Sequence, residues 1–115
     1  WGYAPEYVRA MWLMLQQDDP SDYVIATGQA VSVRDFGHLC FSSVGLNFED
    51  HVEFDERFVR PAEVQSLIGN FGKARDSFGW TPKVLVDQLA TIMVEFEVSR
   101  LKSNEQLVDS PDFGE

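Results

Sequence analysis

Apolar residues recur at helical spacing in four parts of the chain. The first, about 5–17, carries a proline in its first turn, where a helix accepts one. Four large apolar residues share one face of this helix: Val8, Met11, Trp12 and Leu15. The other three parts cover about 32–44, 73–78 and 84–101. The spacing predicts four helices, and the apolar faces of the longer ones are expected to pack into the core.

Residues with known capping roles mark two of the helix ends. Ser32 and Asp35 stand three residues apart at the start of the second helix, which is a capping-box-like arrangement. Gly79 supplies a C-terminal stop for the third helix, and Trp80 is available to pack back against it.

Three shorter runs favour strands. Residues 23–27 and 64–70 are apolar, whereas 51–55 alternate between apolar and polar positions. The elements therefore follow the order α, β, α, β, β, α, α. The sequence predicts an α/β fold with short strands near 23–27 and 64–69 covered by helices.

The composition limits the kinds of partner. With 115 residues, of which 44% are hydrophobic and 13% aromatic, the chain is expected to fold as one domain or as one piece of a larger protein. Its formal net charge of −10 opposes general attraction to nucleic acid or to anionic membranes, so neither is expected as a partner. A small anionic ligand is not excluded, because one or two placed arginines can hold a phosphate locally.

The single cysteine, Cys40, cannot form a disulfide within the chain, and no stretch approaches the roughly 18 apolar residues needed to cross a bilayer. We therefore expect a soluble, cytoplasmic protein. The chain starts with "WGYAPEYV" rather than with methionine, so we expect it to start within a longer protein. Residues 1–102 are expected to form one lobe, and the acidic segment 103–115 to be a flexible tail.

Most of the side chains that could carry chemistry lack the neighbours they would need. His38 and His51 have no cysteine or second histidine at ligand spacing, so no metal site is expected. Cys40 lies on the apolar face of its helix, which favours the thiol over a reactive thiolate. The acidic residues of 49–56 do not follow the order of a calcium-binding loop and are interpreted as a solvated face.

Arg60 and Glu63 form the one pair with a possible binding role. Pro61 fixes the backbone beside the arginine and so stiffens the segment that carries both charges. The guanidinium of Arg60 offers donors in a planar fork that suits phosphate, and Glu63 offers acceptors that suit vicinal hydroxyls. Taken alone, the pair fits an ordinary surface ion pair better than a site.

The order of several motifs along the chain carries a resemblance to a known family. "WGYAPEYVRAMW" is followed by "DYVIATG", "SVRDF", "RPAEVQSLIGN" and "KARDSFGWTPKV", and then by the closing amphipathic helix. Over about residues 1–100 the chain resembles the C-terminal part of the GDP-mannose 4,6-dehydratases, a family of the extended short-chain dehydrogenase/reductase superfamily. "KARDSFGWTP" is shared more widely by extended sugar-nucleotide enzymes.

The resemblance implies a two-part enzyme, a lyase that converts GDP-mannose to GDP-4-keto-6-deoxymannose. An N-terminal Rossmann domain would bind NADP and carry the catalytic Tyr-x-x-x-Lys pair, and the present lobe would close over the GDP-sugar. None of the three tyrosines has a lysine four positions later. The chain is therefore expected to have no catalytic residue, to bind no cofactor by itself and to be inactive alone. The full-length enzyme is expected to be a homo-oligomer.

Two residues carry over directly from the family pattern. Arg60 and Glu63 match its Arg-Pro-x-Glu segment, where the arginine is expected to hold the GDP diphosphate and the glutamate the ribose hydroxyls. Arg34 in "SVRDF" also matches, but a helix-surface arginine beside Asp35 has a simple structural explanation. Arg34 is therefore a weaker substrate-binding candidate.

Two other interpretations stay open from the sequence. The chain could be the same lobe of another extended sugar-nucleotide dehydratase or epimerase, with a different nucleoside diphosphate. It could instead be a free-standing interaction module without catalysis.

Overall fold

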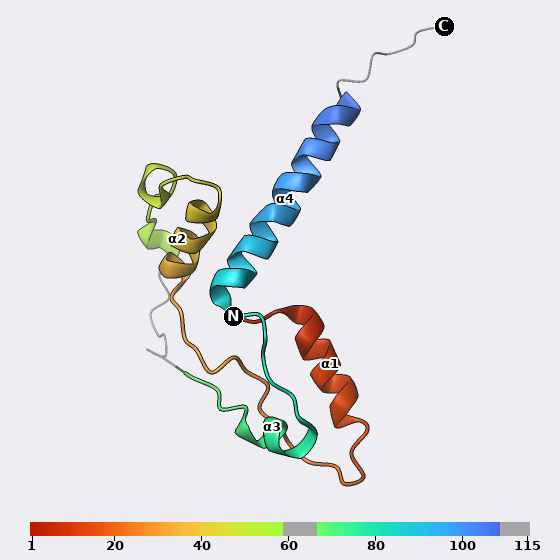
Figure 1. The fold of residues 1–115 in the computed structure, drawn as a ribbon. Helices are drawn as coiled ribbons and strands as arrows, with labels where there is room; N and C mark the ends of the chain where they lie inside the picture. The colour runs from red at the N-terminus through yellow and green to blue at the C-terminus, as the bar shows by residue number, and fades with distance from the viewer. Residues whose placement is uncertain (59–66, 109–115) are drawn as a thin grey trace, which may run out of the picture.

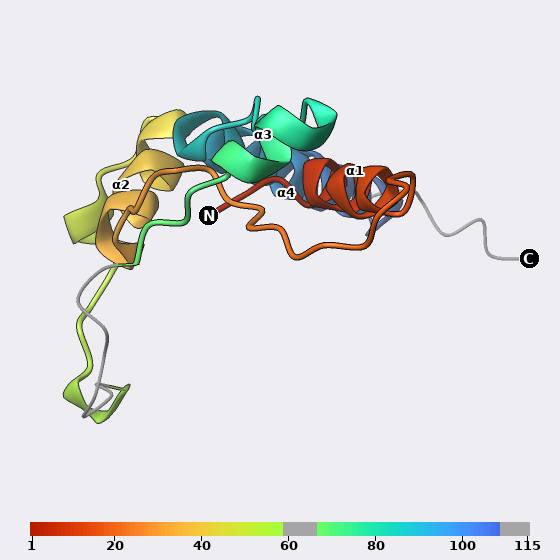
Figure 2. The ribbon, with the colours of Figure 1, turned by 90° about the horizontal axis from the view of Figure 1, so that it is seen from below.

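The computed structural model describes residues 1–58 and 67–108 (Figure 1). Four α-helices and two short 3₁₀ turns account for their regular structure: α1 (Ala4–Met14), α2 (Val33–Ser43), η1 (Phe48–Asp50), η2 (Glu56–Phe58), α3 (Gly72–Phe78) and α4 (Val86–Val108). Figure 2 shows that the segment ending at η2 reaches away from the helices. The described part of the chain is thus a set of helices joined by extended segments.

All four predicted helices are confirmed, and their ends follow the signals in the sequence. The proline of α1 lies in its first turn. The hydroxyl of Ser32 accepts a hydrogen bond from the backbone N–H of Asp35 at 3.0 Å and so caps α2. Gly79 adopts the left-handed conformation, with φ of 71°, and its N–H donates to the carbonyl of Arg75 at the end of α3.

The last helix is longer than the sequence suggested. It was predicted over about 84–101 but extends to Val108, because no glycine or proline lies between Lys83 and Pro111. Residues 103–108 are therefore helical, and the division into a lobe over 1–102 and a flexible tail over 103–115 stays a prediction. Residues 109–115 lie outside the described part of the chain.

The predicted strands at 23–27 and 51–55 are wrong, because neither segment is a strand in the structure. Residues 67–69 of the run predicted at 64–69 are not a strand either, and 64–66 lie outside the described residues. A strand needs a neighbour that pairs its backbone N–H and C=O groups. The fold of the described residues is therefore helical, and the α/β prediction is corrected.

Two of these segments nevertheless lie side by side. A Cβ atom added to Gly69 would come within 2.5 Å of the Ala26 Cβ and 3.2 Å of a Val24 methyl group. Their backbones exchange no hydrogen bond in the described residues. The missing side chain at Gly69 allows the close approach, but the contact is packing rather than a sheet.

The main core lies where α1 and α3 meet. Its buried residues are Ala10, Ala74 and Trp80, surrounded by the half-buried side chains of Leu13, Tyr23, Ile25, Phe71 and Phe78. On the other side of the molecule α2 packs against α4, where Leu89 and Ala90 are buried. Trp80 is the only large aromatic residue among the buried residues of the described chain.

Trp80 connects α1 to the segment that follows α3. Its indole N–H donates to the carbonyl of Glu6 at 3.0 Å. Its ring meets Tyr7 and Phe71 edge to face, with centroids 6.1 and 6.0 Å apart. The expectation that Trp80 packs back against α3 is confirmed, because Trp80 shares one buried cluster with Ala74 of α3.

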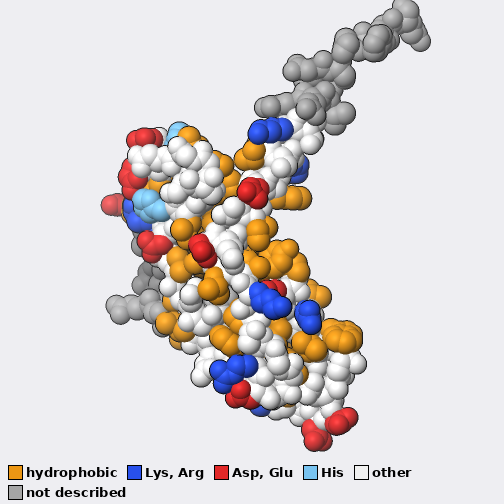
Figure 3. All heavy atoms as spheres, in the orientation of Figure 1, with side chains coloured by type: hydrophobic (Ala, Val, Ile, Leu, Met, Phe, Trp, Pro, Cys, Tyr) orange, Lys and Arg blue, Asp and Glu red, His pale blue; other side chains and the backbone are white. Residues whose placement is uncertain are grey.

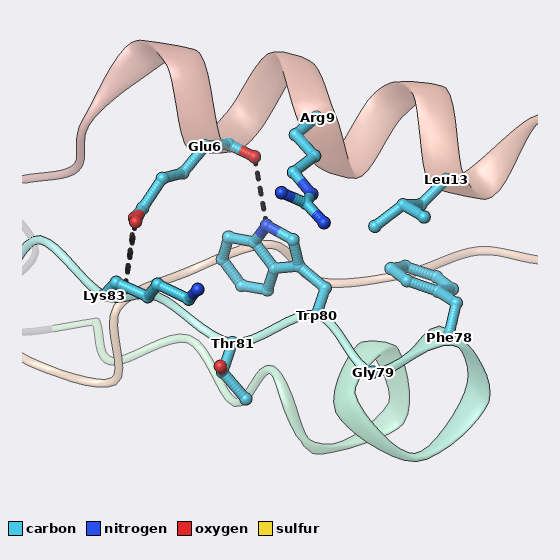
Figure 4. A pocket seen from close by; sticks show the side chains of 8 residues that line it. All are labelled: Glu6, Arg9, Leu13, Phe78, Gly79, Trp80, Thr81 and Lys83. Carbon is cyan, nitrogen blue, oxygen red and sulfur yellow. Dashed lines mark hydrogen bonds between the residues drawn. The ribbon is translucent and has the colours of Figure 1, made fainter.

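Glu6 strengthens the same connection with its side chain. Its carboxylate accepts hydrogen bonds from the backbone N–H groups of Lys83, at 3.1 Å, and Val84, at 3.3 Å (Figure 4). These donors lie just before α4. Glu6 thus holds the start of α1 against the start of α4 through charge-assisted hydrogen bonds.

Trp1 provides a second long-range tie. Its ring stacks on Phe36 of α2, with centroids 4.1 Å apart and planes 10° from parallel. Its indole N–H donates to the carbonyl of Val31 at 2.9 Å. The beginning of the chain is therefore fixed to the beginning of α2.

The predicted inward face of α1 is wrong. Val8, Met11, Trp12 and Leu15 are 63%, 58%, 59% and 81% exposed. The face that enters the core is the opposite one, which carries Ala10 and Leu13. Three residues on the predicted core face of α4 are also exposed: Ile92, Met93 and Phe96. Nothing in the described part of the chain covers these side chains sufficiently to bury them.

Replacing Glu6 by glutamine should lower the free energy of unfolding by about 1–2 kcal/mol, because a neutral amide oxygen accepts the two backbone hydrogen bonds more weakly than a carboxylate. Urea denaturation followed by circular dichroism measures the change. Glu95→Gln is the matched control, since Glu95 is exposed and has no hydrogen-bond partner in the described residues. Equal stability of the two variants would contradict the role assigned to Glu6.

Candidate functional site

The predicted substrate pair falls outside the described residues. Arg60 and Glu63 lie within 59–66, between η2 and Leu67. Their proposed roles toward diphosphate and ribose therefore stay predictions.

An ion pair fixes the segment just before them. The guanidinium of Arg57 donates to the carboxylate of Asp55, with 2.6 Å between Nη2 and Oδ2, and the Arg57 backbone N–H donates to the same carboxylate. The side-chain hydrogen bonds from Arg57 hold the pKa of Asp55 below its ordinary value, and the backbone bond acts in the same direction. Arg57 is thus already paired within the chain.

Arg34 lies in the first turn of α2 and is exposed. The carboxylate of its neighbour Asp35 accepts a hydrogen bond from the Ser32 hydroxyl at 2.6 Å. The role of Arg34 as a weaker substrate-binding candidate stays a prediction. Among the described residues, no carboxylate lies within 4.0 Å of Arg34. Its guanidinium carbon instead lies 5.9 Å from the centre of the Phe48 ring, at cation–π distance.

Arg34 borders an open hollow of about 430 Å³ between α2 and the segment that follows η1. Its lining includes one basic, one acidic and three aromatic side chains: Arg34, Glu53, Phe36, Phe48 and Phe54. A volume of this order is typical of small-molecule sites, and flat apolar rings with a few polar groups suit a nucleotide. The hollow is the best candidate binding site in the described part of the chain.

Aromatic contacts fix two walls of this hollow. Phe36 is held by its stacking on Trp1. Phe48 packs against His38 and Phe41, with ring centroids 4.4 and 5.7 Å away. Its ring also lies so close to Gly37 that a side-chain carbon at that position would overlap it. A glycine in the middle of α2 is therefore explained by the approach of Phe48.

A second hollow, of about 200 Å³, lies at the connection between α1 and Trp80 (Figure 4). Its polar groups include Arg9, Lys83 and Thr81 beside Glu6. The Glu6 carboxylate and the Trp80 N–H are both used to hold the chain together, as described above. This hollow is therefore a structural joint rather than a second ligand site.

The histidines and the cysteine have structural surroundings. The His38 Nε2 lies 3.3 Å from a carboxylate oxygen of Glu49, and His51 stacks on Phe41. No group of three potential metal ligands occurs in residues 1–58 and 67–108. Burial raises the pKa of the Cys40 thiol above its ordinary value, which agrees with its interpretation as an unreactive thiol. Within the same residues, no helix is both long and apolar enough to cross a membrane.

The sequence did not indicate the hollow. Glu53 was grouped with the solvated acidic face, and Phe54 with one side of a strand that does not form. The available signal was the number of aromatic residues on either side of the acidic stretch. Aromatic residues lining a site cannot be told from core residues by spacing alone.

The sequence model of the family described as "GDP-mannose 4,6 dehydratase" matches residues 1–93. The chain is 46% identical over 110 residues to "GDP-mannose 4,6 dehydratase 1" of Arabidopsis thaliana, which covers 96% of this chain and 30% of that protein. It is 40% identical to "GDP-mannose 4,6 dehydratase 2" of Caenorhabditis elegans and 38% identical to "GDP-mannose 4,6 dehydratase" of Homo sapiens, each over 90% of this chain.

These similarities first define the class of protein that the relatives form, the sugar-nucleotide dehydratases. The chain belongs to the GDP-mannose 4,6-dehydratase family, as its matched motifs suggested. It spans only 30–32% of the length of these three relatives. The resemblance seen in the sequence is thus confirmed, and the activity of a whole enzyme remains to be proposed.

Proposed function

We propose that this chain is the substrate-binding portion of a GDP-mannose 4,6-dehydratase, an extended short-chain dehydrogenase/reductase that converts GDP-mannose to GDP-4-keto-6-deoxymannose. The observation that carries the proposal is the family match over residues 1–93. The hollow beside Arg34 adds support, because it offers a basic group and aromatic rings in a space large enough for part of a nucleotide-sugar.

The role of this chain in that reaction is to bind and orient, not to transfer hydride. NADP, bound by the rest of the enzyme, supplies the redox chemistry. The chain has no tyrosine with a lysine four positions later, the pair that the family uses as a base. Its own residues would hold the GDP end of the substrate and help to exclude water from the sugar.

We assign the parts of the substrate as follows. Arg60 holds the diphosphate through its planar set of donors, and Glu63 accepts hydrogen bonds from the ribose hydroxyls. Arg34 adds a positive charge at the rim of the hollow, which Glu53 also lines; no carboxylate of the described residues lies within 4.0 Å of Arg34. Two placed arginines explain how a chain of net charge −10 can contribute to an anion site.

Further properties of the whole enzyme remain predictions. We expect a homo-oligomer, a cytoplasmic location and a place in GDP-fucose biosynthesis. The cytoplasmic location rests on the single free cysteine, which can form no disulfide within the chain.

A chimera tests the proposed function directly. In the Arabidopsis relative, the matched region is replaced by residues 1–115, and the purified protein is assayed with GDP-mannose and with UDP-glucose. We expect turnover of GDP-mannose to its 4-keto-6-deoxy product and little reaction with UDP-glucose. A preference for UDP-glucose would indicate that the chain comes from another sugar-nucleotide dehydratase or epimerase. A folded chimera that turns over neither substrate would support the interpretation as an interaction module.

Arg60→Ala in that chimera should raise the KM for GDP-mannose about 10–100-fold, because a charged hydrogen bond to phosphate is worth roughly 1.5–3 kcal/mol. The affinity for NADP should not change, since NADP is held elsewhere. Steady-state kinetics and NADP titration measure the two effects. Arg100→Ala is the matched control, because Arg100 pairs with Glu97 on α4, and an unchanged KM in Arg60→Ala would remove Arg60 from the site.

A further inference from the structure

Few apolar side chains are well buried in this chain. In the described residues, the buried apolar residues are Ala10, Ala74, Trp80, Leu89 and Ala90, and three of these five are alanines. Among the residues whose burial is described, no large side chain is completely buried. A domain of roughly 100 residues normally encloses a larger core. The described part of the chain therefore leaves apolar surface for a partner.

That surface is most clearly organised on α1. At about 100° per residue, Val8, Met11, Trp12 and Leu15 fall on one side of the helix and Glu6, Ala10 and Leu13 fall roughly on the other. The second side is held in the core and at the Trp80 joint. The first side, which we call the outer stripe, is more than half exposed at every position. A helix that is apolar on both sides is typical of a layer between two others.

The outer stripe also lacks charge. The charged residues of α1 are Glu6, whose carboxylate faces the start of α4, and Arg9, which borders the hollow beside Trp80. An uncharged stripe with tryptophan and methionine is unusual on a chain of net charge −10 and is typical of the centre of a protein interface. Figure 3 shows hydrophobic side chains near the meeting of α1 and the lower part of α4, with basic side chains among them.

The lengths of the relatives indicate what covers the stripe. The match includes α1, yet it accounts for only 30–32% of the relatives' length. In those proteins the equivalent helix belongs to the same polypeptide as the remaining two thirds or so. A partner in the same polypeptide is held near the stripe at a high effective concentration. A second copy of the chain has to bind from solution and has no such advantage.

We propose that the outer stripe of α1 is the docking surface for the part of the dehydratase that lies outside the matched region. The proposal rests on the proposed function, because it takes that part of the enzyme as the partner. It places α1 as a shared layer, with Ala10 and Leu13 facing this lobe and Met11 and Trp12 facing the rest of the enzyme. The docked lobe would then be held in place to present its substrate-binding residues.

Cysteine labelling in the chain and in the chimera tests this placement. Met11→Cys and, separately, Leu15→Cys are made in a Cys40→Ser background, and maleimide labelling at each site is followed by mass spectrometry. Asp19→Cys is the control, because Asp19 is an exposed polar residue beyond the end of α1. Met11→Cys is a mild change, and Leu15→Cys is an independent reporter should the first disturb the helix.

Both stripe positions should react quickly in the isolated chain and at least about 10-fold more slowly in the chimera, whereas the control should react equally in both. Equal labelling of the stripe in the two proteins would overturn the proposal. Protection in the isolated chain together with a dimer in light scattering would also overturn it, in favour of a second copy. The labelling requires no substrate, so a chimera that protects the stripe but does not turn over GDP-mannose would sink only the proposed function.

Discussion

The contact between Trp80 and Glu6 organises the described structure. Trp80 fills the core between α1 and α3, and its N–H donates to the Glu6 carbonyl. The Glu6 carboxylate binds the backbone just before α4. One residue pair therefore joins α1 to α3 and α4, which lie far from it in the sequence. Its position also decides which side of α1 faces inward, because Glu6, Ala10 and Leu13 lie together on that helix.

This constraint leaves the larger apolar side of α1 outward. The consequence is a lobe whose own core is small and whose most apolar helix face is available to another part of the protein. Such a lobe suits an enzyme in which binding residues and catalytic residues lie in different parts. Arg34 and its hollow are at the α2 end of the molecule, whereas the outer stripe is on α1, so the region proposed to bind substrate is separate from the surface proposed to dock.

Local features of the sequence predicted the helices well. Ser32, Gly79 and the proline of α1 act within a few residues of their own positions, and the structure confirms each. The strand predictions were wrong because a strand needs a partner that can be distant in the sequence, and residues 23–27 have no such partner among residues 1–58 and 67–108. Periodicity correctly found an apolar face on α1 but could not identify what covers it.

The sequence predicted the candidate binding site less well than it predicted the helices. Arg60 and Glu63 rest on the family motif and lie outside the described residues. The sequence made Arg34 the weaker substrate-binding candidate because it stands beside Asp35 on a helix surface. In the structure the Asp35 carboxylate accepts a hydrogen bond from Ser32. The hollow itself depends on how Phe48 packs on Gly37, a contact across a loop that no local pattern reveals.

The central claim is that this chain forms half of a GDP-sugar site and needs the rest of the enzyme to complete it. Isothermal titration calorimetry of GDP against residues 1–115 and against the chimera tests it most directly. We predict no measurable binding to the isolated chain at micromolar concentrations and clear binding to the chimera. Micromolar affinity of the isolated chain, equal to that of the chimera, would contradict the account.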